Sequence, residues 1–378
     1  MGFTKTTKTS FLILSDTHGK DHIMPKVPVD VAIHCGDLTD ESKLDEFRSS
    51  LELLKSIDAP LKLVIAGNHD FSLDETAFEN LTAEATTKCH VEPELIKKEY
   101  GDFGQARELC SNPEDESIIF LDEGIHSFRL QNGAALTVYA SPFTPSRDAH
   151  QGFQFKHNDE HDFSISPSDN KRVDIAITHG PPKGVLDRTS SNQRGGCDQL
   201  FAAIAKARPR LHCFGHIHEG WGAKLVTWRG KEPTTTTPSH FTEIDNGASI
   251  LIDSLADYKP RKFDSEQDAK DKKKRKERLF KDGFRSTSHC KDDKHPLVAG
   301  QQTLFVNAAL EMGPEDEDPD AREQVPWIVE LELPNAYHFR NNRGGGWQLR
   351  RSWLWLFCFT PGSGVGEPAW YDHRSGCR

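Results

Sequence analysis

The chain has 378 residues, and its 58 acidic against 47 basic side chains give a formal charge of −11. This balance argues against a general binder of nucleic-acid backbones, which needs a basic face. A small anionic substrate held by metal ions stays compatible with it. The hydrophobic content of 35% and the mean hydropathy of −0.63 are low for a fully packed chain of this length, so part of it is expected to be loop or disorder.

Features of membrane or secreted proteins are weak in this sequence. Apolar runs stay shorter than the roughly 18–20 residues that a membrane span needs, and the polar start at Met1 lacks a signal-peptide core. The eight cysteines are scattered and form no CxxC pair, which favours free thiols over disulfides or a thiolate zinc site. We therefore expect a cytoplasmic protein, with the nucleus as the alternative. The sequence does not indicate the oligomeric state.

Short apolar runs alternate with helical patterns over residues 8–230. The runs predict strands that are buried on both faces: 10–15, 29–34, 61–66, 134–140, 172–178 and 211–214. Apolar side chains at helical spacing predict two helices, one through Leu44, Phe47, Leu51 and Leu54 and one through Cys197, Leu200, Phe201, Ile204 and Ala205. Asp40 is the candidate N-cap of the first helix. This alternation predicts a layered α/β domain.

The composition changes after residue 230. Residues 231–300 have few aliphatic clusters and a charged run at 270–278, so we expect a low-order insertion there. We interpret 272–276 as solvated charge, with a nuclear-localisation signal as the alternative. Strand patterns return at 303–308 and 327–333 and predict that residues 301–334 close the same domain.

The Trp-, Arg- and Gly-rich residues 335–378 are expected to lie outside the core. Their apolar run at 353–359 has no partner pattern. It either docks on another surface or is not natural coding sequence.

Five short polar motifs each follow a predicted strand, where open α/β sheets place their ligand sites. They are Asp16-Thr17-His18, Gly36-Asp37, Gly67-Asn68-His69-Asp70, Thr178-His179-Gly180-Pro181-Pro182 and Gly215-His216-Ile217-His218. Each motif alone is common, because a single histidine at a strand end is more often packed or solvated than a ligand. The ordered set, with every member at a strand end, is specific.

The side chains in these motifs suit two divalent metals. Imidazole suits zinc and iron, whereas carboxylate and amide oxygens suit manganese and magnesium. Two metals roughly 3.5–4 Å apart share a bridging oxygen ligand, and Asp37 is the candidate because it stands alone in its loop. Such a pair polarises a phosphate and lowers the pKa of a bridging water to give hydroxide. His69 is the candidate proton donor to the leaving oxygen, with Asp70 fixing its tautomer.

The order D-x-H, G-D, G-N-H-[DE], H-G and G-H-x-H resembles the calcineurin-like metallophosphoesterase superfamily. The resemblance covers about residues 10–225 and the β segment at 303–333. Residues 178–182, 215–220 and 305–308 are similar to the metallophosphoesterase-domain-containing branch, whose members are class III phosphodiesterases. The resemblance implies a four-layer α/β/β/α sandwich with a dimetal site at the C-terminal ends of the strands.

The resemblance also implies roles for the motif residues. One metal takes Asp16, His18, Asp37 and His218, and the other takes Asp37, Asn68, His179 and His216. His69 matches the leaving-group histidine of the family. We expect two divalent ions, with Mn²⁺ as the first choice and Fe, Zn or Mg as alternatives.

One departure bears on the substrate. The protein phosphatases of the superfamily carry G-D-x-V-D-R-G, whereas this chain reads Gly36-Asp37-Leu38-Thr39-Asp40 and lacks that arginine. The leading prediction is therefore a phosphoester hydrolase (EC 3.1) acting on a small phosphodiester such as a cyclic nucleotide. The alternatives are a phosphomonoesterase or protein phosphatase, and a non-catalytic scaffold. The complete ligand set argues against the scaffold.

Overall fold

The computed structural model describes residues 5–111, 114–147, 150–165, 172–230, 237–259, 261–310 and 324–336. All of them belong to the first of two units into which the chain divides, Met1–Phe339. The predictions made for the tail after residue 336 lie outside the described residues. Among the described helices, none is long and apolar enough to cross a membrane.

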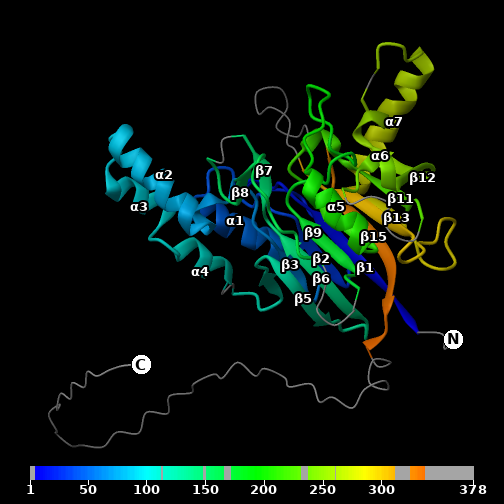
Figure 1. Cartoon of the computed structure of the whole chain (residues 1–378), viewed down its shortest axis with the longest axis horizontal. Coiled ribbons are helices and arrows are strands. Elements are labelled where there is room, and N and C mark those ends of the chain that lie inside the picture. The colour runs from blue at the N-terminus through cyan, green and yellow to red at the C-terminus, as the bar shows by residue number, and fades with distance from the viewer. Residues whose placement is uncertain are drawn as a thin grey trace, which may run out of the picture. The chain divides into compact units, whose positions relative to one another are not determined.

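The chain alternates strands and helices along most of its length (Figure 1). The strands are β1 Thr6–Leu14, β2 Val31–His34, β3 Lys62–Val64, β4 Ile118–Phe120, β5 Gly124–Arg129, β6 Ala135–Ser141, β7 Thr144–Ser146, β8 Gln154–Lys156, β9 Ile175–Thr178, β10 Leu211–Phe214, β11 Gly222–Trp228, β12 Ile244–Ser254, β13 Arg285–Ser288, β14 Gln302–Asn307 and β15 Trp327–Pro334. The helices are α1 Leu44–Lys55, α2 Glu75–Lys88, α3 Pro93–Tyr100, α4 Gln105–Ser111, α5 Asp198–Ala207, α6 His240–Glu243 and α7 Glu266–Asp282, with short 3₁₀ turns η1 Phe71–Leu73, η2 His218–Gly220 and η3 Leu255–Asp257.

Two large sheets form the centre of the molecule. The six-stranded sheet has the order β13-β15-β1-β2-β3-β4, and the seven-stranded sheet has the order β12-β11-β14-β10-β9-β6-β5. Strands β1, β2 and β3 run parallel, as do β6, β9, β10 and β14. Because parallel strands end at the same edge, the loops after them gather there.

The alternation of side chains along β1 shows how the layers are built. Phe11 and Ile13 join a core cluster that fills the space between the two sheets. Leu12 and Leu14 face the opposite way and pack with Phe47 of α1. Helix α5 covers the outer face of the other sheet through a third cluster. The domain is thus a four-layer α/β/β/α sandwich, which confirms the predicted fold class.

Every strand predicted from an apolar run is present in the structure. The runs correspond to β1, β2, β3, β6, β9, β10, β14 and β15. The predicted N-cap of the first helix was wrong. Helix α1 begins at Leu44 with Lys43 as its N-cap, and the backbone N–H of Lys43 donates to Glu46 at 2.9 Å. Asp40 lies upstream of this cap, at the edge of the cleft described below.

The expectation of low order in residues 231–300 was also wrong for much of that stretch. Strand β12, helix α7 and strand β13 lie within it. Helix α7 begins with a capping box between Ser265 and Asp268 and ends at Gly283, whose φ is 74°. Lys272, in the charged run, is buried and pairs with Asp264 at 2.7 Å. The apolar pattern was misleading because the caps define the ends of this helix, and only Leu279 and Phe280 near its C-terminal end pack against the core.

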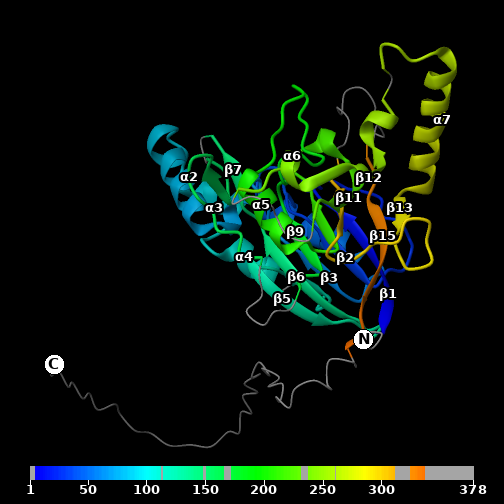
Figure 2. The ribbon, with the colours of Figure 1, turned by 45° about the vertical axis from the view of Figure 1, so that its right-hand side comes forward.

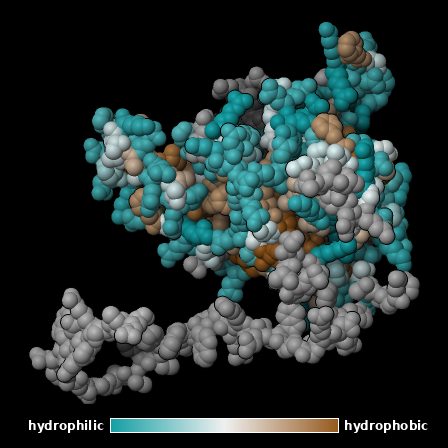
Figure 3. Space-filling model, in the orientation of Figure 1, coloured by the Kyte–Doolittle hydropathy of each residue, from teal (hydrophilic) through white to brown (hydrophobic). Residues whose placement is uncertain are grey.

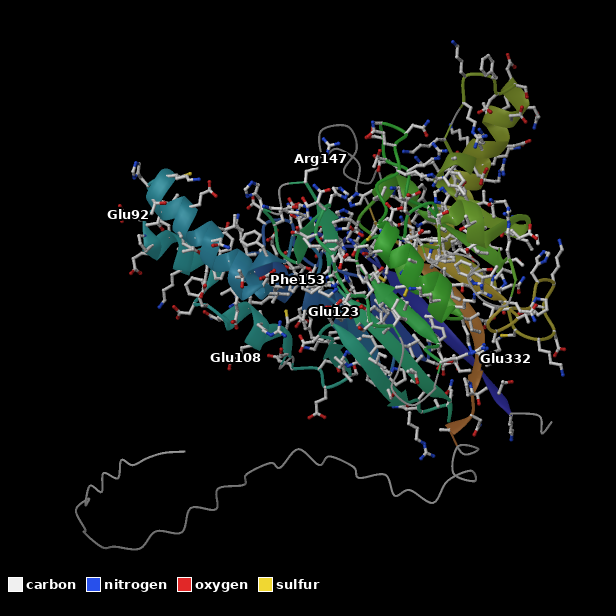
Figure 4. The ribbon with its side chains drawn as sticks, in the orientation of Figure 1. Glu92, Glu108, Glu123, Arg147, Phe153 and Glu332 are labelled. Carbon is white, nitrogen blue, oxygen red and sulfur yellow. The ribbon has the colours of Figure 1, made fainter. Side chains whose placement is uncertain are left out.

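Two helical parts extend from the sheets at opposite ends of the described structure. Helix α7 projects at one end, as both ribbon views show (Figures 1 and 2), and its visible surface is mostly hydrophilic (Figure 3). Helices α2, α3 and α4 form a lobe at the other end, which the sequence patterns did not predict. Glu92, between α2 and α3, lies at the outer end of this lobe, away from the sheets (Figure 4).

Candidate metal centre

The five motifs meet at one edge of the sandwich, with contributions from both sheets. Asp16 and His18 follow β1, and Asp37 follows β2. Asn68 and His69 lie in the loop that follows β3. The second sheet provides the rest: His179 follows β9, and His216 and His218 follow β10.

Potential ligand atoms from these residues cluster closely. Three overlapping groups have ligand atoms within 4.8 Å of one another: Asp16, His18 and His218; His18, Asp37 and His69; and Asp37, His179 and His216. Asp37 and His18 each belong to two of the three groups, and of these two Asp37 is the carboxylate, whose two oxygens can each bind a metal. This is the position that a carboxylate shared between two metals would occupy.

The contacts inside the cluster show that its donor set fits divalent cations. The Nε2 atom of His179 lies 2.9 Å from Oδ1 of Asn68 and 3.2 Å from Oδ2 of Asp37. On the other side, Nε2 of His218 lies 3.4 Å from Oδ1 of Asp16. Asp16 and Asp37 are only 1% and 2% exposed. Among the described residues, only histidines form ion pairs with these two buried carboxylates. Buried charges need such compensation, and a metal ion supplies it.

Several of these residues have an unusual backbone conformation. The φ angles of Asp16, His18, Asp37 and His216 are 58°, 51°, 53° and 66°. This left-handed region is uncommon for residues other than glycine and costs of the order of 1 kcal/mol or more each. The surrounding structure holds these strained turns, and they direct the side chains into one cluster.

At two positions in the motifs, the backbone lies so close to a candidate ligand that only glycine fits. A Cβ atom on Gly67 would lie 2.2 Å from Oδ1 of Asp37, and one on Gly215 would lie 1.9 Å from Oδ2 of Asp16. Any larger residue at either position would therefore displace a carboxylate.

The electrostatics of the cluster favour bound positive charge. Burial raises the pKa of Asp37, but the charges of His179 and His18 outweigh it and hold the pKa below its ordinary value. Burial lowers the pKa of His179, yet Asp37 and Asp16 raise it overall to about 9. Burial lowers the pKa of His216 to about 4. The protonated ring of His179 thus balances the negative charge of Asp37, and a metal bound to both side chains would displace the proton from this ring.

Hydrogen bonds from outside the cluster orient three of the ligand candidates. The Nδ1 atom of His179 lies 2.9 Å from the carbonyl oxygen of Cys35, and Nδ1 of His18 lies 3.1 Å from that of Thr39. The side-chain amide of Asn68 donates to Oε1 of Gln151 at 2.8 Å. Partners of this kind fix the donor atom that each ligand presents to a metal.

The structure does not support the proposed pairing of Asp70 with His69. Asp70 is fully buried and accepts hydrogen bonds from the backbone N–H groups of Gly67, Leu38 and Thr39 and from the Thr39 hydroxyl. It therefore braces the loops that carry Asp37 and Asn68. Burial and then the charge of Asp37 raise the pKa of Asp70 to about 7, although the hydrogen bonds from the Thr39 hydroxyl and from the N–H groups of Gly67 and Leu38 lower it.

The partner of His69 is Asp40. The Nδ1 atom of His69 lies 2.7 Å from the backbone carbonyl oxygen of Asp40. A carbonyl oxygen can only accept, so Nδ1 carries a hydrogen and Nε2 is the atom that can act in the cleft. The side chain of His69 is 30% exposed, more than those of the buried ligand candidates.

A polar cleft of about 330 Å³ lies over the cluster. Its walls include Lys20, His22 and Asp40, none of which the sequence patterns indicated as a site residue. Gln151 was missed as well, because no motif marks it and it is far from Asn68 in the chain. His34 and His212, which the sequence places beside motif residues, are fully buried and hydrogen-bond to Thr17 and Thr178, each at 2.9 Å.

The chain matches known proteins over the part that builds this site. The family model described as calcineurin-like phosphoesterase matches residues 9–220. Human metallophosphoesterase domain-containing protein 1 is 32% identical over 218 residues, which cover 57% of this chain and 62% of the relative. A protein named probable rhamnogalacturonate lyase C, from Emericella nidulans, is 31% identical over 217 residues, which cover 57% of this chain and 18% of the relative. The chain therefore spans less than two thirds of the length of both relatives.

The family match covers the strands and the loops that carry all seven ligand candidates. Together with the α/β/β/α sandwich, it shows that the chain belongs to the calcineurin-like phosphoesterase family.

Proposed function

We propose that this protein is a metal-dependent hydrolase of small phosphodiesters. The convergence of two buried carboxylates, one amide and four imidazoles on a single cleft carries this proposal. Asp16, His18, Asp37 and His218 would hold one metal, and Asp37, Asn68, His179 and His216 the other, with Mn²⁺ as the expected ion. When bound, the metals supply Lewis acidity that polarises the phosphate and activates water.

The protein's own contribution to bond cleavage centres on His69. A water oxygen forms a bond to phosphorus and gives up a proton to solvent, while the bond from phosphorus to the leaving oxygen breaks. The electron pair of that bond stays on the leaving oxygen, which takes the Nε2 proton of the His69 ring in its doubly protonated form. The ring then regains a proton from solvent. The carbonyl oxygen of Asp40 holds Nδ1 of the ring at 2.7 Å and so fixes which nitrogen faces the cleft.

The charge of the cleft supports a diester over a monoester. Lys20 is the only lysine or arginine among the described residues that line it. A phosphodiester carries one negative charge near neutral pH, whereas a monoester dianion carries two and gains more from a fixed arginine clamp. The site therefore suits a small, singly charged substrate better than a phosphoprotein. A nucleic-acid polymer is not expected, given the net charge of −11.

The test compares two chromogenic esters that share a leaving group. The Mn²⁺-loaded protein is expected to hydrolyse bis-p-nitrophenyl phosphate with a higher kcat/KM than p-nitrophenyl phosphate. A clear preference for the monoester would contradict the diester assignment. Binding of metal without cleavage of either ester would favour the non-catalytic scaffold.

A further inference from the structure

A second cavity opens beside the candidate metal centre, on the side of His69. Its volume is about 300 Å³, and Asp40 and His69 contribute to the walls of both cavities. The remaining wall comes largely from η1, α2 and α3, that is, from the helical lobe. We call it the aromatic chamber, after Phe71, Phe78 and Tyr100 in its lining.

The three rings of the aromatic chamber pack against one another. The ring centroids of Phe71 and Tyr100 are 5.7 Å apart, those of Phe78 and Tyr100 are 6.1 Å apart, and those of Phe71 and Phe78 are 6.4 Å apart. Phe78 is buried, whereas Phe71 and Tyr100 are half-buried. The rings are held by packing and still expose surface on which an apolar group can lie.

The charge of the aromatic chamber differs from that of the metal centre. Among the described residues that line it, there is no lysine or arginine, and Asp40 is the only carboxylate. Leu81 and Ile96 add aliphatic surface. Apart from His69 and His150, this described lining offers an anionic group no cationic side chain, whereas an apolar group would gain by leaving water.

We propose that the aromatic chamber receives the organic group of the leaving alcohol. Preferred substrates would then be phosphoesters of aryl or similarly apolar alcohols. The inference rests on the proposed function, because His69 stands between the phosphate cleft and the aromatic chamber and donates to the leaving oxygen. An ester with its phosphate at the metal centre and its leaving oxygen at His69 directs its organic group into the aromatic chamber.

Binding of two phosphonates to the Mn²⁺-loaded full chain tests this without relying on turnover. Phenylphosphonate and methylphosphonate offer the same metal-binding group, and calorimetry measures their affinities. Wild type is expected to bind phenylphosphonate more tightly. Tyr100→Ala is expected to lower the affinity for phenylphosphonate about three- to tenfold and to leave the affinity for methylphosphonate unchanged.

A matched control lies on the same helix. Leu95 of α3 is 56% exposed and does not line the aromatic chamber, so Leu95→Ala should leave both affinities unchanged. Ala85→Leu fills the aromatic chamber from α2 without removing a contact. This variant should lower the affinity for phenylphosphonate as Tyr100→Ala does. It provides the same test if Tyr100→Ala fails to fold.

Three results would overturn the inference: equal affinity of wild type for both phosphonates, equal weakening of both by Tyr100→Ala or Ala85→Leu, or binding of neither. Failure of the proposed function has a different signature. In that case the Mn²⁺-loaded protein binds phenylphosphonate in this pattern and yet cleaves no phosphoester. That result would support the aromatic chamber as a binding site and contradict the proposed hydrolase function.

Discussion

Asp37 is the residue on which the candidate centre most depends. Its Oδ1 atom accepts the backbone N–H of His69 at 2.8 Å, and its Oδ2 atom lies 3.2 Å from Nε2 of His179. The two carboxylate oxygens thus face different sides of the cluster. A positive φ of 53° and close packing against Gly67 fix this orientation.

His69 has a role separable from that of the ligands, and His69→Ala tests it. The variant should retain its metals and lose about 10²–10⁴-fold in kcat on diesters of poor leaving groups, because their oxygen needs a proton. It should lose much less on p-nitrophenyl esters. Steady-state kinetics with metal analysis measures both effects. Because His69 also belongs to one ligand group, loss of metal in this variant would show it to be a ligand instead of an acid.

His212 makes stability depend on pH. Burial lowers its pKa to about 3, whereas an unfolded imidazole titrates near 6.5. Between these values the unfolded chain binds a proton that the folded chain does not, so the free energy of unfolding falls as the pH drops below about 6.5. For one such histidine the loss between pH 7 and pH 5 is about 2 kcal/mol.

The variant His212→Gln should therefore lose about 2 kcal/mol less than wild type between these pH values. Urea unfolding in the presence of a chelator measures this without a contribution from metal release. The exposed His157 provides the control, since His157→Gln should behave as wild type. Equal pH dependence of His212→Gln and wild type would contradict a neutral, buried His212.

At the scale of elements, apolar runs were a reliable guide where strands are buried on both faces. Residues 211–214 illustrate this, because every side chain of β10 is buried. Helix α7 was missed because its start is marked by a capping box and its apolar contacts with the core are confined to Leu279 and Phe280 near its C-terminal end, which leaves no continuous apolar stripe in the sequence. The lobe of α2, α3 and α4 was missed as well, although α3 begins with a proline at its first turn.

Within the site, all seven ligand candidates were identified from strand-end motifs. The structure brings them together: six belong to the three ligand groups, and Asn68 contacts His179 at 2.9 Å. The partners that orient them were harder to predict. Gln151 and Asp40 act through contacts between segments distant in sequence, and neither has a spacing that marks it. The assignment of Asp70 followed sequence adjacency, whereas the fold turns its side chain toward buried N–H groups.

The segment between β7 and β8 therefore carries a positioning residue. Gln151→Leu keeps the approximate volume but removes the acceptor for the Asn68 amide. We expect Mn²⁺ affinity to fall about 10–100-fold, because Asn68 is then free to rotate its Oδ1 atom away. Titration calorimetry measures this, with the exposed Gln131→Leu as control. Unchanged affinity in Gln151→Leu would mean that Asn68 is held by other contacts or is not a ligand.

At the scale of the molecule, the candidate centre joins the two sheets at one edge. Asp16, Asp37 and Asn68 follow strands of one sheet, whereas His179 and His216 follow strands of the other. Strands β14 and β15 enter the interiors of the two sheets, so we infer that residues 8–230 and 301–334 form one domain. Metal bound at this edge would link both halves of its sandwich.

Metal binding should therefore stabilise the whole domain. Mn²⁺ at a hundredfold excess over its Kd should raise the free energy of unfolding by about 2.7 kcal/mol per site, because it binds the folded chain alone. Denaturant unfolding with and without Mn²⁺ measures the increase. Asp37→Asn should show little of it. Equal stabilisation of wild type and Asp37→Asn would place the metal elsewhere.

The central claim is that these seven side chains hold two metals that support phosphodiester hydrolysis. Elemental analysis of the purified full chain, paired with bis-p-nitrophenyl phosphate hydrolysis after chelation and Mn²⁺ re-addition, tests it most directly. The account predicts about two metals per chain and activity that chelation removes and Mn²⁺ restores. A chain that binds no metal, or whose diester cleavage survives complete chelation, would contradict it.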